Sequence, residues 1–353
     1  ADVRLIQDTN NNGTIDSGEI LAWQWERGTS NESIRRFLNA GTYFVQVLNY
    51  NNQTADYSLN TGFTAATSDD QQFRIELVFS DTLTGLSTAA RNAISEAARF
   101  WESIITSRSS ITRSNTLTIT LTGESLTFSD GTVDTGTLAI SGPTFTVDSA
   151  NNLVITRGSS TLNIRKFSEF NANPNYLKLI MIHEFVHVFG FGTAWEPVEF
   201  VLSNGTRFTA GTTWINTTTV TYAANSYAGS AYGDLLGTYT PTAVPIEPRI
   251  FAHWDETRFD TELMTPFAES AGTASPLSSV TLAALRDLGW NVNMGAAEAF
   301  ALSTTQLQAI TTSDDSEAPS SGRAAYKCAC SRCLAGVRTE LSPSLSEAIG
   351  VSV

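Results

Sequence analysis

Short alternations of apolar and polar residues predict that the N-terminal part of the chain consists of β-strands. Four such stretches are separated by turns rich in Asn, Gly and Asp, at residues 3–8, 19–25, 41–49 and 55–59. We therefore expect a small all-β, sandwich-like module over residues 1–63. The polar sequence TAATSDD at residues 64–70 then forms a linker.

A second unit begins at residue 72, where the pattern first predicts a half-buried strand and then a helix. The alternating apolar residues of the strand are Phe73, Ile75, Leu77 and Phe79. Over residues 86–105 the apolar residues recur at helical spacing, and Ser87 is placed to cap that helix. Renewed alternation predicts further strands at residues 116–122, 144–147, 152–156 and 161–164.

The second unit continues with a helix over residues 175–190, NYLKLIMIHEFVHVFG, which is apolar on nearly all sides and should be buried. Residues 191–275 are loop-rich. A closing helix is predicted in PLSSVTLAALRDLGW, with Ser278 or Ser279 as its cap and Gly289 as its end. These elements predict an α+β domain with a twisted mixed sheet over residues 72–295, followed by a linker and a cysteine-containing tail over residues 311–353.

Charge excludes some classes of partner. The chain has 353 residues, of which 16% are charged, and a formal net charge of −14. An acidic protein of this kind is repelled by nucleic acids and by anionic membrane surfaces, so neither is expected as a partner. The sequence contains no apolar run of about 18 residues, so we do not expect a transmembrane protein.

The helix over residues 175–190 carries the sequence HEFVH, which is typical of a zinc site. His183 and His187 are four residues apart, so both imidazoles lie on one helix face and can reach one metal ion. Glu184 is rotated by about 100° from His183 and lies beside the metal, where a general base can take a proton from a zinc-bound water. The alternative is that both histidines belong to the core of a buried helix.

The number of histidines indicates where a third ligand lies. The short metzincin signature is H-E-x-x-H-x-x-G-x-x-H; Gly190 fits it, but Thr193 stands where the last histidine should be. A catalytic zinc takes three protein ligands and keeps one position open. The chain has three histidines in all, and the one outside the helix is His253. We therefore predict that His253 is the third ligand.

The segment AHWDETRFDTELMTP at residues 252–266 resembles the part of leishmanolysin-type metzincins that carries the third histidine and the Met-turn. The sequences GFGTAW and PLSSVTLAALRDLGW add to the likeness, which spans roughly residues 72–293. The resemblance implies a metzincin-type α+β catalytic domain with His183, His187 and His253 as zinc ligands. It also implies that Glu184 is the general base and that Met264 lies beneath the zinc site.

The same resemblance implies a secreted, extracellular or cell-envelope zinc endopeptidase that acts on proteins or peptides, and we expect a monomer. Ala1 leads directly into a predicted strand, so no signal peptide is expected in this chain. Unlike its disulfide-rich eukaryotic relatives, the predicted core contains no cysteine. Two other interpretations stay open: a non-enzymatic surface or adhesion protein with a structural zinc site, and a zinc enzyme that acts on another bond.

The N-terminal module carries a second metal signal. The sequence LNAGTYFVQVLNYNNQTADYSL at residues 38–59 resembles the later part of the bacterial pre-peptidase C-terminal domain, a small β-sandwich. Before it, DTNNNGTIDSGE has the spacing of a twelve-residue calcium loop. Calcium would be held by Asp8, Asn10, Asn12, Thr14, Asp16 and Glu19, with Gly13 at the bend. The alternative is a polar Asn/Gly turn without metal.

All three cysteines lie in the sequence KCACSRC near the C-terminus, at Cys328, Cys330 and Cys333. Three thiolates could hold a metal, although a structural zinc site takes four ligands. One thiolate could instead cap the catalytic zinc as an inhibitory ligand. The third possibility is a tail with one disulfide or with free thiols.

Overall fold

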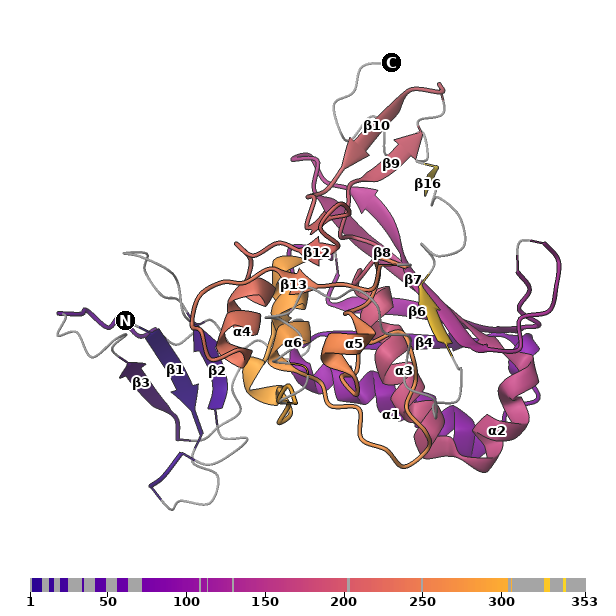
Figure 1. The fold of residues 1–353 in the computed structure, drawn as a ribbon, viewed down its shortest axis with the longest axis horizontal. Coiled ribbons are helices and arrows are strands. Elements are labelled where there is room, and N and C mark those ends of the chain that lie inside the picture. The colour runs from indigo at the N-terminus through magenta and orange to yellow at the C-terminus, as the bar shows by residue number, and fades with distance from the viewer. Residues whose placement is uncertain are drawn as a thin grey trace.

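The computed structural model describes most of the second unit and short segments elsewhere. It covers residues 72–303 except 108, 113, 129, 202, 203 and 249, together with residues 2–7, 13–15, 20–24, 34, 42–48, 56–62, 306, 327–330 and 339–340. The predicted linkers over residues 64–70 and 311–326 lie outside the described residues. The architecture is mixed α+β, as predicted, with several helices packed against a twisted mixed sheet (Figure 1).

The N-terminal region contains a three-stranded antiparallel sheet in the order β2-β1-β3. Its strands, β1 (Asp2–Ile6), β2 (Ile20–Gln24) and β3 (Phe44–Leu48), confirm three of the four predicted strands. The fourth prediction is wrong for its described part, because residues 56–59 have no regular secondary structure and are exposed. An apolar–polar alternation this short makes a strand only where a neighbouring strand can pair with it.

The central sheet has five strands in the order β15-β7-β8-β6-β4. They are β4 (Arg74–Phe79), β6 (Thr116–Glu124), β7 (Thr137–Val147), β8 (Leu153–Asn163) and β15 (Lys327–Cys330). β4, β6 and β8 are parallel to one another, whereas β7 runs antiparallel to β8 and parallel to β15. The sheet is therefore mixed, as the sequence predicted.

β8 corrects the prediction of two separate strands at residues 152–156 and 161–164. The intervening residues RGSS look like a turn, yet they pair with both neighbouring strands. Gly158 lies beneath the helix that carries the HEFVH sequence, and a Cβ there would be 2.3 Å from Cγ1 of Val188. Ser160 is fully buried and its hydroxyl is hydrogen-bonded to that of Ser141 at 2.7 Å. These polar residues thus stay in the strand because their partners lie on other elements.

The two long helices of the second unit pack together on one face of the sheet (Figure 1). α1 (Thr88–Ile104) is capped by Ser87, as predicted, and α3 (Pro174–Val188) follows the short α2 (Phe167–Ala172). α3 is buried along most of its length. Two tryptophans hold its backbone: Nε1 of Trp101 donates to the carbonyl of Ile182 at 2.9 Å, and Nε1 of Trp290 donates to that of Phe189 at 2.7 Å.

The remaining elements are short. The strands are β5 (Ile105–Ser107), β9 (Val198–Val201), β10 (Arg207–Ala210), β11 (Ile215–Asn216), β12 (Thr221–Tyr222), β13 (Val244–Pro245), β14 (Asn291–Val292) and β16 (Thr339–Glu340); the helices are α4 (Tyr227–Leu235), α5 (Glu256–Phe259) and α6 (Ser279–Asp287). Single 3₁₀ turns occur at Asp81–Leu83, Ile164–Lys166 and Met294–Ala296.

Residues 191–275 are loop-rich, as predicted, but they also contain α4, which local sequence does not predict. Two glycines inside α4 weaken its intrinsic helix propensity. They are needed because a Cβ at Gly229 would lie 2.2 Å from the carbonyl oxygen of Ala224, and one at Gly233 would lie 2.0 Å from that of Thr240. Both carbonyls belong to residues that flank α4 in the chain, so the turns on either side of the helix require glycine at these two positions.

The closing helix α6 agrees with the prediction and resolves its cap. Ser278, not Ser279, is the cap, and its side chain accepts a hydrogen bond from the backbone N–H of Thr281. The helix ends at Gly289, whose φ of 97° favours glycine. Within the described part of the chain, no helix is long and apolar enough to cross a membrane.

Candidate metal centre

The end of α3 places two histidines on one face and then turns the chain sharply. His183 and His187 lie one helical turn apart and are buried. The helix ends in a tight turn in which Gly190 has a φ of 97° and the N–H of Phe191 donates to the carbonyl of Val186 at 3.2 Å. Gly190 therefore has the left-handed backbone that the metzincin pattern predicted for it.

A second glycine lets the segment that carries His253 approach the end of α3. Gly192 has a φ of 80°, and a Cβ there would lie 2.7 Å from Cβ of Ala252, the residue before His253. The backbone of His253 is fixed from the other side, because its carbonyl accepts a hydrogen bond from the N–H of Glu247 at 2.9 Å. His253, 66 positions after His187 in the sequence, is thus held in a defined position beside the end of α3.

The three histidines meet at their Nε2 atoms, as predicted. These atoms are 3.1 Å apart between His183 and His187, 3.0 Å apart between His187 and His253, and 3.3 Å apart between His183 and His253. Among the described residues, these three form the group of potential ligands that could hold a metal ion. In a tetrahedral site with metal–nitrogen distances of about 2.0–2.1 Å, ligand nitrogens are about 3.3 Å apart. The donors therefore fit one metal ion and are compatible with zinc.

Hydrogen bonds on the other side of the rings orient two of these ligands. Nδ1–H of His183 donates to the carbonyl of Leu263 at 2.6 Å, and Nδ1–H of His187 donates to that of Phe191 at 3.1 Å. These bonds assign the proton to Nδ1, so that the Nε2 lone pairs face one another. Lone pairs at this separation repel unless a cation lies between them, and carbonyl partners of this kind are usual for metal-bound histidines.

The environment keeps all three imidazoles neutral. Burial lowers the pKa of His183 to about 4. Burial lowers the pKa of His187 and of His253 well below 6.5, and the neighbouring imidazoles lower both further. Because only the neutral ring can bind a metal, all three residues are in the binding-competent form at neutral pH.

The other predicted residues of the site lie as follows. Glu184 is fully buried on α3, directly after His183. Met264 is also fully buried, and its carbonyl accepts a hydrogen bond from the N–H of Trp254 at 3.0 Å, so the Met-turn lies beside the residue that follows His253. Thr193 is buried but lies outside the group of three ligands.

Sequence reasoning missed Glu262, which holds the Met-turn. Its fully buried carboxylate accepts hydrogen bonds from the N–H of Met264 at 2.5 Å, from the hydroxyl and N–H of Ser278, and from the hydroxyl of Thr281 at 2.6 Å. The adjacent carbonyl, that of Leu263, orients His183. No local pattern marks this role, because Ser278 and Thr281 lie 16 and 19 residues further along the chain.

Replacing Glu262 by Gln should weaken metal binding. The carboxylate faces donors only, so an amide NH₂ would point at another donor, and such a mismatch costs roughly 1–3 kcal/mol. Loss of an outer partner of a ligand typically lowers metal affinity by about 10–100-fold. Competition with a fluorescent zinc chelator measures the change. Glu298→Gln is the matched control, because Glu298 also accepts a backbone hydrogen bond, from Leu277 at 2.7 Å, but is exposed. Equal affinities of both variants and the wild type would contradict this role.

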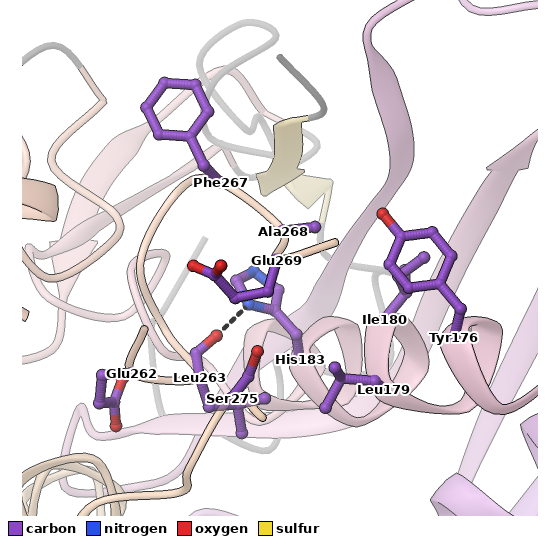
Figure 2. Close-up of a pocket in the computed structure, with 10 residues that line it drawn as sticks. All are labelled: Tyr176, Leu179, Ile180, His183, Glu262, Leu263, Phe267, Ala268, Glu269 and Ser275. Carbon is purple, nitrogen blue, oxygen red and sulfur yellow. Dashed lines mark hydrogen bonds between the residues drawn. The ribbon is translucent and has the colours of Figure 1, made fainter. Parts of the chain in front are cut away.

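A small pocket opens beside His183 (Figure 2). Leu179 and Ile180 of α3 line it on one side, and Phe267 and Glu269 line it from the segment after the Met-turn. Burial, followed by the charge of Asp260, raises the pKa of Glu269. One of the three histidines, His183, therefore borders a mostly apolar pocket.

Two predicted sites fall largely outside the described residues. In the calcium loop, Asp8, Asn10, Asn12, Asp16 and Glu19 are not described; Thr14 is exposed, and Gly13 has a φ of 72°, which fits the predicted bend. In the cysteine tail, Cys333 is not described, whereas Cys328 and Cys330 lie in β15.

Comparisons with known proteins do not assign the chain: no protein-family model matches it, and no curated protein matches it either.

Proposed function

We propose that the chain is a secreted zinc-dependent endopeptidase of the metzincin type. The observation that carries the proposal is the meeting of three buried Nε2 atoms, 3.0–3.3 Å apart, on and beside a helix that also carries Glu184. Two ligands come from α3 and the third from a distant segment followed by Met264. The order of these residues along the chain matches the leishmanolysin-type pattern.

In this proposal each residue of the site has a separate role. Zinc, when bound, polarises a carbonyl group and lowers the pKa of a water to about 7. Glu184 accepts the proton of the attacking water and delivers it to the nitrogen of the leaving amine. Leu263 and Phe191 act only through their carbonyls, which keep the imidazoles of His183 and His187 in the tautomer that binds metal.

The pocket beside His183 would accept one side chain of the substrate. Its walls from Leu179, Ile180 and Phe267 favour a small apolar group next to the bond that is cleaved. The substrate backbone would lie extended along β7, on the side away from β8, as an added strand. Both features suit a peptide.

The rival interpretation is a non-enzymatic surface protein in which zinc is structural. Structural zinc sites are closed by four protein ligands, whereas a catalytic site keeps one position open. The described residues provide three ligands, and one of them, His183, lines an open pocket. These two observations favour an enzyme. Assays with different substrates distinguish a peptidase from a zinc enzyme that acts on another bond.

Metal removal tests the proposal. We expect the purified chain to contain one zinc per molecule and to cleave casein or gelatin; 1,10-phenanthroline should abolish cleavage, and added zinc should restore it. Zinc content is measured by mass spectrometry of the metal, and cleavage by release of labelled peptides. Cleavage that survives complete metal removal contradicts the proposal. If the wild-type chain and the variant Ala329→Pro each bind one zinc and neither cleaves the substrate, the structural role is supported instead.

A further inference from the structure

The free edge of the central sheet is covered by a segment from near the C-terminus. β8 pairs with one edge of β7. β15 pairs in parallel with the other edge, with Ala329 opposite Ile140 and Cys330 opposite Ser141. β15 also lies against α3, the helix that carries two of the three metal ligands. Figure 1 shows β15, in yellow, between β7 and α3.

A second pairing holds the same C-terminal region. β16 pairs in parallel with β9, with Thr339 opposite Phe200 and Glu340 opposite Val201. The tail therefore contacts the metal-binding domain through two separate strands. Neither pairing was predicted from the sequence, in which residues 311–353 look like a linker and a small tail.

We propose that Lys327–Cys330 is an internal competitor that occupies the strand position of an extended peptide substrate at β7. This inference rests on the proposed peptidase function. An edge strand offers one row of N–H and C=O groups, so it can pair with only one additional strand at a time. A substrate that pairs with β7 near α3 must first displace β15.

The geometry of the pairing suits an occupant that can leave. The segment is four residues long and parallel, and parallel pairing is slightly less stable per residue than antiparallel pairing. The register also shifts between Lys327 and Ala329, which interrupts the ladder. Because the segment is part of the same chain, it nevertheless competes at an effective concentration on the order of millimolar.

Two proline variants of the full chain test the inference. Alternate residues of a strand direct their N–H groups to opposite sides, so either Ala329→Pro or Cys330→Pro must remove a hydrogen bond to β7. Cys330→Ser is the control for the thiol of Cys330. A labelled synthetic peptide with the sequence of residues 325–331, AYKCACS, probes the vacated edge by fluorescence anisotropy. This binding measurement does not depend on catalysis.

We expect one proline variant to bind the peptide at least about fivefold more tightly than the wild type does, and to show a correspondingly lower KM for casein-derived peptides with little change in kcat. Cys330→Ser should behave as the wild type. Equal peptide binding by all variants overturns the inference, as does a lower KM in Cys330→Ser alone, which would assign the effect to the thiol. Tighter peptide binding without cleavage by any zinc-loaded variant supports the docking of the tail and counts against the peptidase function.

Discussion

Glu184→Gln is expected to lower kcat/KM for peptide cleavage by about 10²–10⁴-fold while one zinc stays bound. The substitution preserves the size of the side chain but removes the carboxylate that is proposed to accept the proton of the attacking water. It leaves the ligand set unchanged, because His183, His187 and His253 alone bring ligand atoms together among the described residues. Loss of cleavage with retention of metal would therefore assign Glu184 to the chemistry and not to metal binding.

The measurement combines cleavage of a labelled casein with the zinc content of the same preparation. Glu96→Gln is the matched control: Glu96 is an exposed glutamate on α1 that contacts Lys178 of α3 at 3.0 Å, and exposed pairs of this kind contribute little to stability. The control should cleave at the wild-type rate. If Glu184→Gln retains wild-type activity, Glu184 is not the base, and the proposed mechanism is wrong.

His253→Ala is expected to lower zinc affinity by more than about a hundredfold and to abolish cleavage. Removal of an outer hydrogen-bond partner of a ligand already costs about 10–100-fold, and His253 supplies one of only three ligand atoms in the group. The other two Nε2 atoms of the group are already assigned as ligands, so no further nitrogen of the group can take its place. The variant also leaves a two-histidine site, which binds zinc weakly.

Thr193→Ala provides the control for His253→Ala, because Thr193 occupies the position at which the short metzincin signature has its last histidine. It is buried but lies outside the ligand group, so its loss should leave zinc affinity within about twofold of the wild type. Affinities are measured by competition with a chelator of known strength. Undiminished zinc binding by His253→Ala, or a large loss in Thr193→Ala, would show that the third ligand has been misassigned.

Local sequence determined the elements whose signals are local. The helices α1 and α6 follow from apolar spacing and from serine caps, and α3 follows from a long apolar run that ends at glycine. Because an α-helix has 3.6 residues per turn, the spacing of His183, Glu184 and His187 fixes their relative directions around the helix axis. Counting histidines then identified His253 without any knowledge of its position in space.

Other features depended on contacts between distant segments. β8 stays continuous through Gly158 because Val188 of α3 packs on it, and the start of α4 is fixed by Asp287 of α6, whose carboxylate accepts hydrogen bonds from the N–H groups of Tyr227 and Ala228. Glu262 could not be recognised as the support of the Met-turn, since its partners lie on α6. The pattern of residues along a segment indicates helix or strand periodicity, but it does not indicate which distant segment packs against it.

The sequence by itself thus determined the mixed α+β class, and it predicted two candidate ligands with Glu184 beside them on one helix and the histidine that completes the group. Only the tertiary structure decided that three Nε2 atoms converge within 3.3 Å, that a pocket opens beside His183, and that β15 covers the free edge of β7. The physical reason is the distance along the chain over which each effect acts. Helix and strand periodicities act over a few residues, whereas ligand convergence and strand pairing require segments far apart in the chain to meet.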